Sequence, residues 1–184
     1  MSDFDLADSN LPRGMLSAYI GLGSNQGDRL VQLSEAVYHL DGALDLEVVA
    51  VSSAYESAPS GMPPGTRDFL NAVIKISTRM QPGDLLATCL GLETLMGRNR
   101  SWVVSDRPID LDILHVEGVI LRTPDLILPH QRAHVRTFVL MPWIEIEPGL
   151  RLHGATIEEW LEMLPPEDRI PCEYFGEIPP YQML

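Results

Sequence analysis

The sequence has few cysteines, a single lysine and no long apolar run. Its two cysteines, Cys89 and Cys172, have neither a Cys-x-x-Cys nor a Cys/His spacing, which excludes a disulfide framework and a zinc site. No stretch approaches the roughly 20 apolar residues that a membrane span needs. The acidic start, MSDFDLADSNLPRG, lacks the basic and apolar regions of a secretory signal. We therefore expect a cytoplasmic globular protein with reduced thiols and no membrane partner.

Basic charge is also scarce. The formal net charge is −13, from 13 basic and 26 acidic side chains, which excludes a general electrostatic surface for nucleic acid. Lys75 is the single lysine, and six arginines with only five acidic residues fall between Arg98 and Arg136. Because the planar guanidinium fork suits phosphate, this stretch predicts a local anion site on an acidic protein. The alternative is that these arginines are spread over the surface by chance.

The hydrophobic pattern predicts one domain at residues 17–164, after a disordered leader at 1–16 and before an acidic tail at 165–184. Strands are expected at 17–23, 47–57, 68–78 and 107–116, with amphipathic helices at 26–40 and 82–96. Shorter helices are expected at 136–143 and 155–164. The order strand–helix–strand–strand–helix–strand indicates an α+β, ferredoxin-like fold, with an antiparallel sheet and two helices on one face.

Alternation along the third strand separates a core face from a second face. The core face is predicted to carry Leu70, Ala72, Ile74 and Ile76. Phe69 and Asn71 share the opposite face, where a ring and an amide could stack on and hydrogen-bond a flat heterocycle. Ordinary packing with a satisfied amide is the alternative.

Two carboxylates on the fourth strand suggest a metal site. Asp110 and Asp112 in RPIDLDIL are two residues apart, so both point to one side of a strand. Magnesium commonly binds one or two carboxylates together with substrate phosphates. Arg98, Arg100 and Arg107 precede the pair and could neutralise phosphate charge. The alternative is two solvated aspartates on an exposed face.

The remaining candidates are a glycine-rich turn and a histidine. GLGSNQGDR at 21–29 is not a dinucleotide fingerprint, because Gln26 stands at the sixth place. We expect a tight turn in which Ser24 or Asn25 caps the following helix. His130 follows a proline in LPHQRAHVRTF, with His134 and Arg136 nearby, and is a candidate functional residue; an inert loop histidine is the alternative.

Taken together, these motifs resemble the 6-hydroxymethyl-7,8-dihydropterin pyrophosphokinase family of folate biosynthesis. The resemblance runs in order from about residue 17 to 150. It rests on AYIGLGSNQGDR at 18–29, VSSAYESAPSG at 51–61, DFLNAVIKIST at 68–78, ETLMGRNR at 93–100, RPIDLDIL at 107–114 and LPHQRAHVRTFVLMPWIEIEP at 128–148.

The resemblance implies transfer of diphosphate from ATP to the pterin hydroxymethyl group, with release of AMP. It implies that Asp110 and Asp112 hold two magnesium ions and that Arg98, Arg107 and Asp112 are catalytic. Nucleotide contacts are implied at Glu93, Arg100, Ile113 and His130. Pterin contacts are implied at Ser57, Ser60, Phe69, Asn71, Arg136 and Phe138, the two rings enclosing the pterin.

The sequence departs from the family pattern on the nucleotide side. Leu90 replaces a helix glutamine, Val103 and Val104 replace an arginine and a tryptophan of the catalytic loop, and Gln131 replaces a tyrosine. A catalytically weakened pterin- or nucleotide-binding protein on the same fold is therefore the alternative function. A magnesium nucleotidyltransferase, which would release pyrophosphate, is a third.

Overall fold

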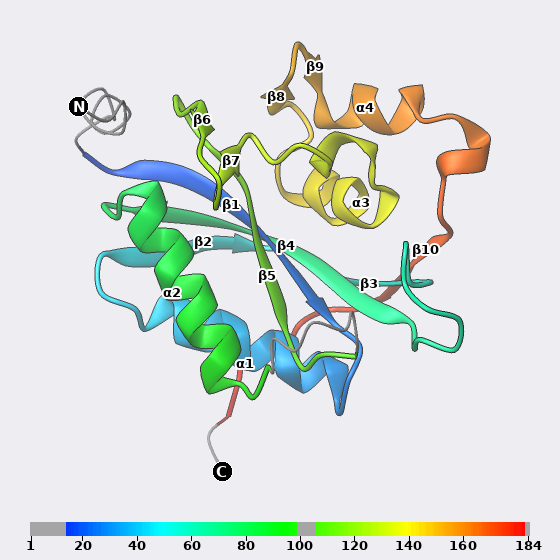
Figure 1. Ribbon diagram of the computed structural model, residues 1–184, viewed down its shortest axis with the longest axis horizontal. Helices are drawn as coiled ribbons and strands as arrows, with labels where there is room; N and C mark the ends of the chain where they lie inside the picture. Colours follow the sequence, from blue (N-terminus) through cyan, green and yellow to red (C-terminus); the bar gives the residue numbers. More distant parts are fainter. Residues whose placement is uncertain (1–13, 99–105, 183–184) are drawn as a thin grey trace.

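The computed structural model describes residues 14–98 and 106–182. Within them, one antiparallel sheet lies between helices on its two faces (Figure 1). The central strands are β1 (Leu16–Ser24) and β4 (Phe69–Thr78), paired along their whole length. β5 (Asp110–Val116) pairs with the free side of β1, and β2 (Leu46–Val51) and β3 (Ala54–Ser57) pair with the free side of β4.

One face of the sheet is covered by α1 (Arg29–Asp41) and α2 (Pro82–Leu95), as predicted. Leu33 and Leu40 of α1 and Leu85 and Cys89 of α2 are buried against it. The predicted core face of β4, with Leu70, Ala72, Ile74 and Ile76, packs here and is confirmed. The alternation of apolar residues therefore correctly predicted which side of β4 faces the helices.

The opposite face carries α3 (Thr137–Ile146) and α4 (Ile157–Met163), seen above the sheet in Figure 1. Leu140 and Trp143 of α3 form a second core with Tyr19, Val73 and Leu114 of the sheet. Polar and aromatic side chains of β4 and β5 continue along this face next to the start of α3. This face therefore holds both a small core and the pocket described below.

Three predicted boundaries are wrong for local reasons. The first helix begins at Arg29 because the Asp28 side chain accepts the Val31 N–H, so neither Ser24 nor Asn25 is the cap. The fourth strand begins at Asp110, not at residue 107. The predicted strand 47–57 is divided, because Ser52 and Ser53 interrupt it between β2 and β3.

Short elements complete the connections. The segment 117–135 contains the hairpin of β6 (Leu121–Arg122) and β7 (Ile127–Leu128) and a 3-10 turn at Ala133–Val135. A second hairpin of β8 (Arg151–Leu152) and β9 (Ala155–Thr156) precedes α4. Thr156 and Glu159 cap α4 reciprocally in a capping box, which fixes where this helix begins.

The tail, for which the sequence predicted no structure, joins the sheet. After a 3-10 turn at Pro166–Asp168, β10 (Cys172–Gly176) pairs antiparallel with β3 and forms an edge of the sheet.

Most of the predicted leader lies outside the described residues, and the predicted domain boundaries at 16/17 and 164/165 stay predictions. Across the described chain, no helix combines the length and apolar character that crossing a membrane requires.

Candidate active site

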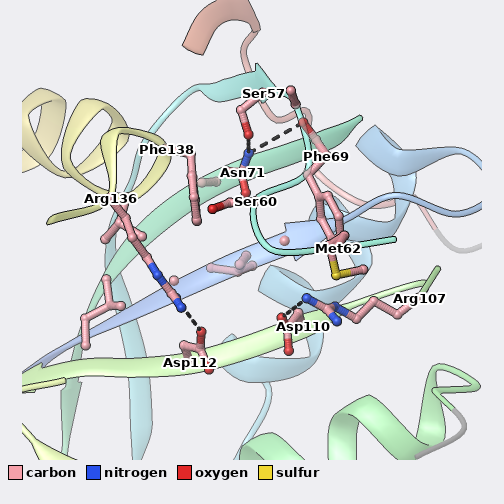
Figure 2. A pocket seen from close by; sticks show the side chains of 17 residues that line it. Ser57, Ser60, Met62, Phe69, Asn71, Arg107, Asp110, Asp112, Arg136 and Phe138 are labelled. Carbon is pink, nitrogen blue, oxygen red and sulfur yellow. Dashed lines mark hydrogen bonds and ion pairs between the residues drawn. The ribbon is translucent and has the colours of Figure 1, made fainter. Parts of the chain in front are cut away.

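A pocket of about 110 Å³ opens between the sheet and the start of α3 (Figure 2). Strands β1, β3, β4 and β5, the loop after β3 and the first turn of α3 all contribute to it. Nine of the residues predicted to form a site line it together: Ser57, Ser60, Phe69, Asn71, Arg107, Asp110, Asp112, Arg136 and Phe138. Residues far apart in sequence therefore meet in one cavity.

Two glycines of β1 keep the floor of the pocket open. A Cβ at Gly23 would lie 3.6 Å from the Phe69 ring, 3.7 Å from Asn71 Oδ1 and 3.8 Å from Asp110 Cβ. A Cβ at Gly21 would approach Leu114 to 3.3 Å, which is tighter than ordinary packing. The spacing of these glycines, two residues apart on a strand, places both on the pocket side.

Arginine side chains surround the two carboxylates of β5. Arg107 Nη2 lies 2.8 Å from Asp110 Oδ2, and Arg98 Nη1 pairs with Asp110 Oδ1. Arg136 Nη1 lies 3.9 Å from Asp112 Oδ2 (Figure 2). Both oxygens of Asp110 thus have a cationic partner, and the positive charge of the arginines offsets the negative charge of the two carboxylates.

Asp112 is the carboxylate whose protonation is most perturbed. The pKa of Asp112 is raised to about 6, chiefly by desolvation and next by the nearby Asp110 carboxylate, while Arg136 opposes the rise. At pH 7 the group is mostly ionised, yet its affinity for a proton is well above that of an ordinary aspartate. Asp112 can therefore exchange a proton near neutral pH.

Hydrogen bonds orient the Asn71 amide. Its Nδ2 donates to Ser57 Oγ at 3.0 Å and to the Tyr55 carbonyl at 3.3 Å. This direction leaves Oδ1 on the side of Gly23 and the pocket floor. The amide is 7% exposed, so a ligand that donates an N–H to Oδ1 would meet a fixed acceptor.

Aromatic rings stand at both sides of this amide. Phe69 comes from β4 and Phe138 from α3, and both line the pocket (Figure 2). The Arg107 guanidinium lies 5.1 Å from the Phe69 ring centre, and that of Arg136 lies 5.7 Å from the Phe138 ring centre. Each of the two rings therefore lies against an arginine that also faces a β5 carboxylate.

Two buried polar side chains, Glu93 and Asn25, hold residues that surround the Asp110 and Asp112 carboxylates. Glu93 on α2 is 1% exposed; its carboxylate pairs with Arg98 and accepts the Leu111 N–H at 2.8 Å. Asn25 accepts the Arg107 N–H at 2.8 Å and donates to Asp106 at 2.7 Å. Asn25 therefore positions Arg107, a function that its predicted role as a helix cap did not include.

Two other predicted nucleotide contacts, His130 and Ile113, do not line the pocket. His130 donates its backbone N–H to the Leu114 carbonyl at 2.8 Å, and burial lowers the pKa of its imidazole to about 4, so the ring is neutral at pH 7. Ile113 is 3% exposed and packs in the core on the α2 side, so its backbone is what could contact a nucleotide. Arg100, Trp102, Val103 and Val104 lie outside the described residues. The roles assigned to these residues stay predictions.

Met62, Leu114 and Val139 also line the pocket and were not predicted. In the sequence, Leu114 and Val139 belong to ordinary apolar patterns, which do not distinguish a residue that lines a pocket from one in the core. Met62 lies in a loop whose direction is set by tertiary contacts. The pair Gly21 and Gly23 did carry a signal, because glycines two apart inside a strand often mark a close approach by a ligand or side chain.

The donor set suits magnesium better than a transition metal. No cluster of three or more His, Cys, Asp or Glu arranged to hold a metal occurs within residues 14–98 and 106–182. Two carboxylates facing one cavity match the needs of Mg²⁺, which completes its octahedron with water and phosphate oxygens. Asp110 and Asp112 could therefore hold this ion once a phosphate ligand is present.

Comparison with known proteins decides the family. Residues 19–148 match the family described as 7,8-dihydro-6-hydroxymethylpterin-pyrophosphokinase (HPPK). The chain belongs to this family. It is 42% identical over 153 residues to the 2-amino-4-hydroxy-6-hydroxymethyldihydropteridine pyrophosphokinase of Methylorubrum extorquens, covering 83% of this chain and 96% of that protein. The Haemophilus influenzae protein of the same name is 37% identical over 78% of this chain and 89% of its own length.

Solved structures support the fold of the HPPK family. Chains of Plasmodium falciparum HPPK-DHPS superpose with TM-scores of 0.63 and 0.64 at 15% and 14% sequence identity. The match covers 83% and 82% of this chain but only 46% and 43% of those chains, so it spans less than half of the Plasmodium protein. At this identity the likeness concerns the fold alone, and the family assignment rests on the sequence matches.

Proposed function

We propose that the chain transfers diphosphate from ATP to the hydroxymethyl group of 6-hydroxymethyl-7,8-dihydropterin and releases AMP, as a step of folate biosynthesis. The observation that carries this is the single pocket in which Phe69, Phe138 and Asn71 adjoin Asp110 and Asp112. A flat heterocycle fits the first group and a phosphate chain the second. The names of the relatives support the same reaction and give no support to a pure binding protein.

The pterin ring would bind between Phe69 and Phe138. Stacking on two rings contributes affinity for any flat aromatic molecule, so the edge contacts must supply the specificity. Asn71 Oδ1, held by the bonds of its amide nitrogen to Ser57 and Tyr55, would accept an N–H from the pterin edge. This pose directs the hydroxymethyl group toward β5 and its carboxylates.

The reaction would form a bond from the hydroxymethyl oxygen to the β-phosphorus of ATP. The bond between this phosphorus and the oxygen bridging to the α-phosphate breaks, and AMP departs with the electron pair. Arg98 and Arg107 would leave Asp110 to bind phosphate oxygens and neutralise the developing charge. The Asp112 carboxylate, which faces the same cavity, would accept the hydroxyl proton.

Two magnesium ions held by Asp110 and Asp112 would neutralise the β- and γ-phosphates when ATP is bound. Within the described part of the chain, no group of three or more His, Cys, Asp or Glu side chains offers a metal site, so these two carboxylates would need phosphate and water oxygens to complete the coordination. Arg100 and His130 are proposed to contact the nucleotide, whereas the buried carboxylate of Glu93 would act by holding Arg98. We further infer a cytoplasmic enzyme that binds these small molecules and neither nucleic acid nor membrane.

We also infer that the fold is ferredoxin-like. The sheet order β5–β1–β4, followed by β2 and β3 together, with α1 and α2 on one face, corresponds to that arrangement. On this view residues 17–164 form the single catalytic domain, and β10 extends its sheet from the tail.

Substitution of Asp110 tests this function. Asp110→Ala removes a carboxylate from the phosphate end and leaves Phe69, Phe138 and Asn71 in place. We expect turnover to fall by at least about 10³-fold, because charge neutralisation supplies most of the rate in such transfers. Calorimetry with pterin and a non-hydrolysable ATP analogue checks that the pterin still binds. Retained turnover in this variant would refute the proposed role of the β5 carboxylates.

A further inference from the structure

The interruption between β2 and β3 leaves a backbone N–H without a partner in the sheet. Three residues lie between Val51 and Tyr55, whereas two lie between their partners on β4, Ile74 and Asn71, so one extra residue is accommodated. Ser52 stays attached to β4, because its N–H donates to the Val73 carbonyl at 3.0 Å and its hydroxyl accepts the Val73 N–H at 2.9 Å. Ser53 is the residue turned away from the ladder.

The carboxylate of Glu145 on α3 binds the residues at this break. The Ser53 N–H lies 3.1 and 3.0 Å from its two oxygens, and the Ser53 hydroxyl donates to Oε1 at 2.9 Å. The Tyr55 hydroxyl donates to Oε2 at 3.1 Å. Desolvation, then Glu145, raises the pKa of Tyr55 to about 12, so the phenol keeps its proton. One carboxylate thus accepts from three donor groups, two on Ser53 and one on Tyr55.

These bonds join two elements that form opposite parts of the pterin pocket. Glu145 lies seven residues after Phe138, which is two helical turns, so both side chains emerge from the same side of α3. Ser53 lies directly before β3 and Tyr55 lies within it, and the last residue of β3, Ser57, accepts a hydrogen bond from the Asn71 amide. The spacing between Phe138 and the Ser57–Asn71 pair therefore depends on how α3 is held against β3.

We propose that Glu145 is a positioning residue for the pterin site. It touches no substrate; it fixes α3 relative to β3 and so sets the width of the pocket between Phe138 and Asn71. The inference rests on the proposed function for the identity of the ligand. Because ATP would bind along β5, away from β3, the role concerns the pterin and not the nucleotide.

Glu145→Gln tests this role with little change in side-chain size. The neutral amide keeps one acceptor oxygen for Ser53 but turns the other position into a donor and removes the charge, so the charge-assisted bonds of the clamp are weakened. We expect KM and the dissociation constant for the pterin to rise about five- to tenfold, while kcat and KM for ATP change less than about twofold. Tyr55→Phe, which removes one of the three donors, should give a smaller change in the same direction.

Glu147→Gln is the matched control. Glu147 lies directly after the last residue of α3 and pairs with Lys75 of β4 at 2.5 Å, but it has no hydrogen bond or ion pair to β3. The KM and the dissociation constant of Glu147→Gln for the pterin should therefore stay within about twofold of those of the unmodified chain. Unchanged pterin affinity in Glu145→Gln, or an equal loss for pterin and ATP in both variants, would overturn the proposal.

Hydrogen exchange separates failure of this inference from failure of the proposed function. Amides 53–57 should exchange faster in Glu145→Gln than in the unmodified chain, with no ligand present. If the unmodified chain binds pterin and releases AMP but these amides do not change, the positioning role is refuted and the function stands. If the unmodified chain neither binds pterin nor releases AMP, both are refuted.

Discussion

At the scale of single residues, the sequence predicted the carboxylates, rings and amide of the pocket better than it predicted their supports. Asp110, Asp112, Phe69 and Asn71 were assigned to the correct faces of their strands, because strand alternation is a local property. Asn25 was misassigned as a cap, since its bonds to residues 106 and 107 depend on tertiary contacts that no local pattern encodes.

Asn25 and Asp28 can be distinguished by substitution. Asn25→Ala leaves the partly buried backbone N–H of Arg107 without its side-chain acceptor, so we expect the free energy of unfolding to fall by about 1–2 kcal/mol and turnover to fall with it. Asp28→Ala removes the true helix cap and should cost about 1 kcal/mol with turnover preserved. Urea unfolding and initial rates measure both. Full turnover in Asn25→Ala would show that Asn25 does not position Arg107.

Arg107 occupies a carboxylate oxygen that a cation would otherwise contact. Arg107→Met should therefore increase the affinity of the nucleotide-free protein for Mn²⁺ by at least about threefold, because a competing charge 2.8 Å from Asp110 Oδ2 is removed. The same variant should lose turnover by about 10³-fold, since the arginine no longer neutralises phosphate. Electron paramagnetic resonance measures free Mn²⁺, and Arg151→Met, in the distant β8–β9 hairpin, is the control. Unchanged or weaker Mn²⁺ binding would contradict this competition.

At the scale of elements, long periodic segments were predicted and short or interrupted ones were not. The helices covering the first face and the central strands follow from repeats of apolar residues. The break at Ser52 was missed because the run VVAVSSAYES is uniformly compatible with a strand. β10 was missed because CEYFG is short and acquires its conformation by pairing with β3.

The tail is also attached to α1, which gives a test at the scale of elements. Ser34 Oγ donates to the Pro179 carbonyl at 2.6 Å, and Tyr38 and Tyr181 have ring centres 5.5 Å apart. Ser34→Ala should reduce the free energy of unfolding by about 1–2 kcal/mol, because a buried donor is lost. Amides near residues 172–182 should exchange faster, while those of β1 keep their protection. Equal acceleration in both segments would indicate global destabilisation and not release of the tail.

At the scale of the whole molecule, the sequence indicated an acidic α+β protein with an anion site, and the structure places Arg98, Arg107 and Arg136 beside the β5 carboxylates, whereas Arg122 lies apart from them in the β6–β7 hairpin. What the sequence could not predict was the second core on the other face. Tyr19, Trp143 and Leu140 meet there from strands and a helix that are distant in sequence. That core seats α3, and with it Arg136 and Phe138, at the pocket.

Protonation of buried histidines should destabilise the molecule in acid, opposed in part by Asp112, whose raised pKa of about 6 favours the folded state as pH falls. Burial is the largest cause lowering the pKa values of His115, His130 and His134, that of His130 to about 4. Between the ordinary histidine pKa of about 6.5 and these lower values, the unfolded chain binds more protons than the folded chain, so stability falls as pH decreases through this window. Denaturant unfolding at pH 7 and pH 5 measures the loss, and His130→Gln should reduce its size. A loss of the same size in that variant would contradict a contribution from His130.

The central claim is that one pocket joins a pterin to the diphosphate of ATP. The most direct measurement is an incubation of the full chain with ATP, Mg²⁺ and 6-hydroxymethyl-7,8-dihydropterin, with chromatography of the nucleotide products. We predict that AMP forms only when the pterin is present, in equal amount to the pterin diphosphate. Release of pyrophosphate or ADP in its place, or absence of AMP while pterin binding is intact, would contradict the account.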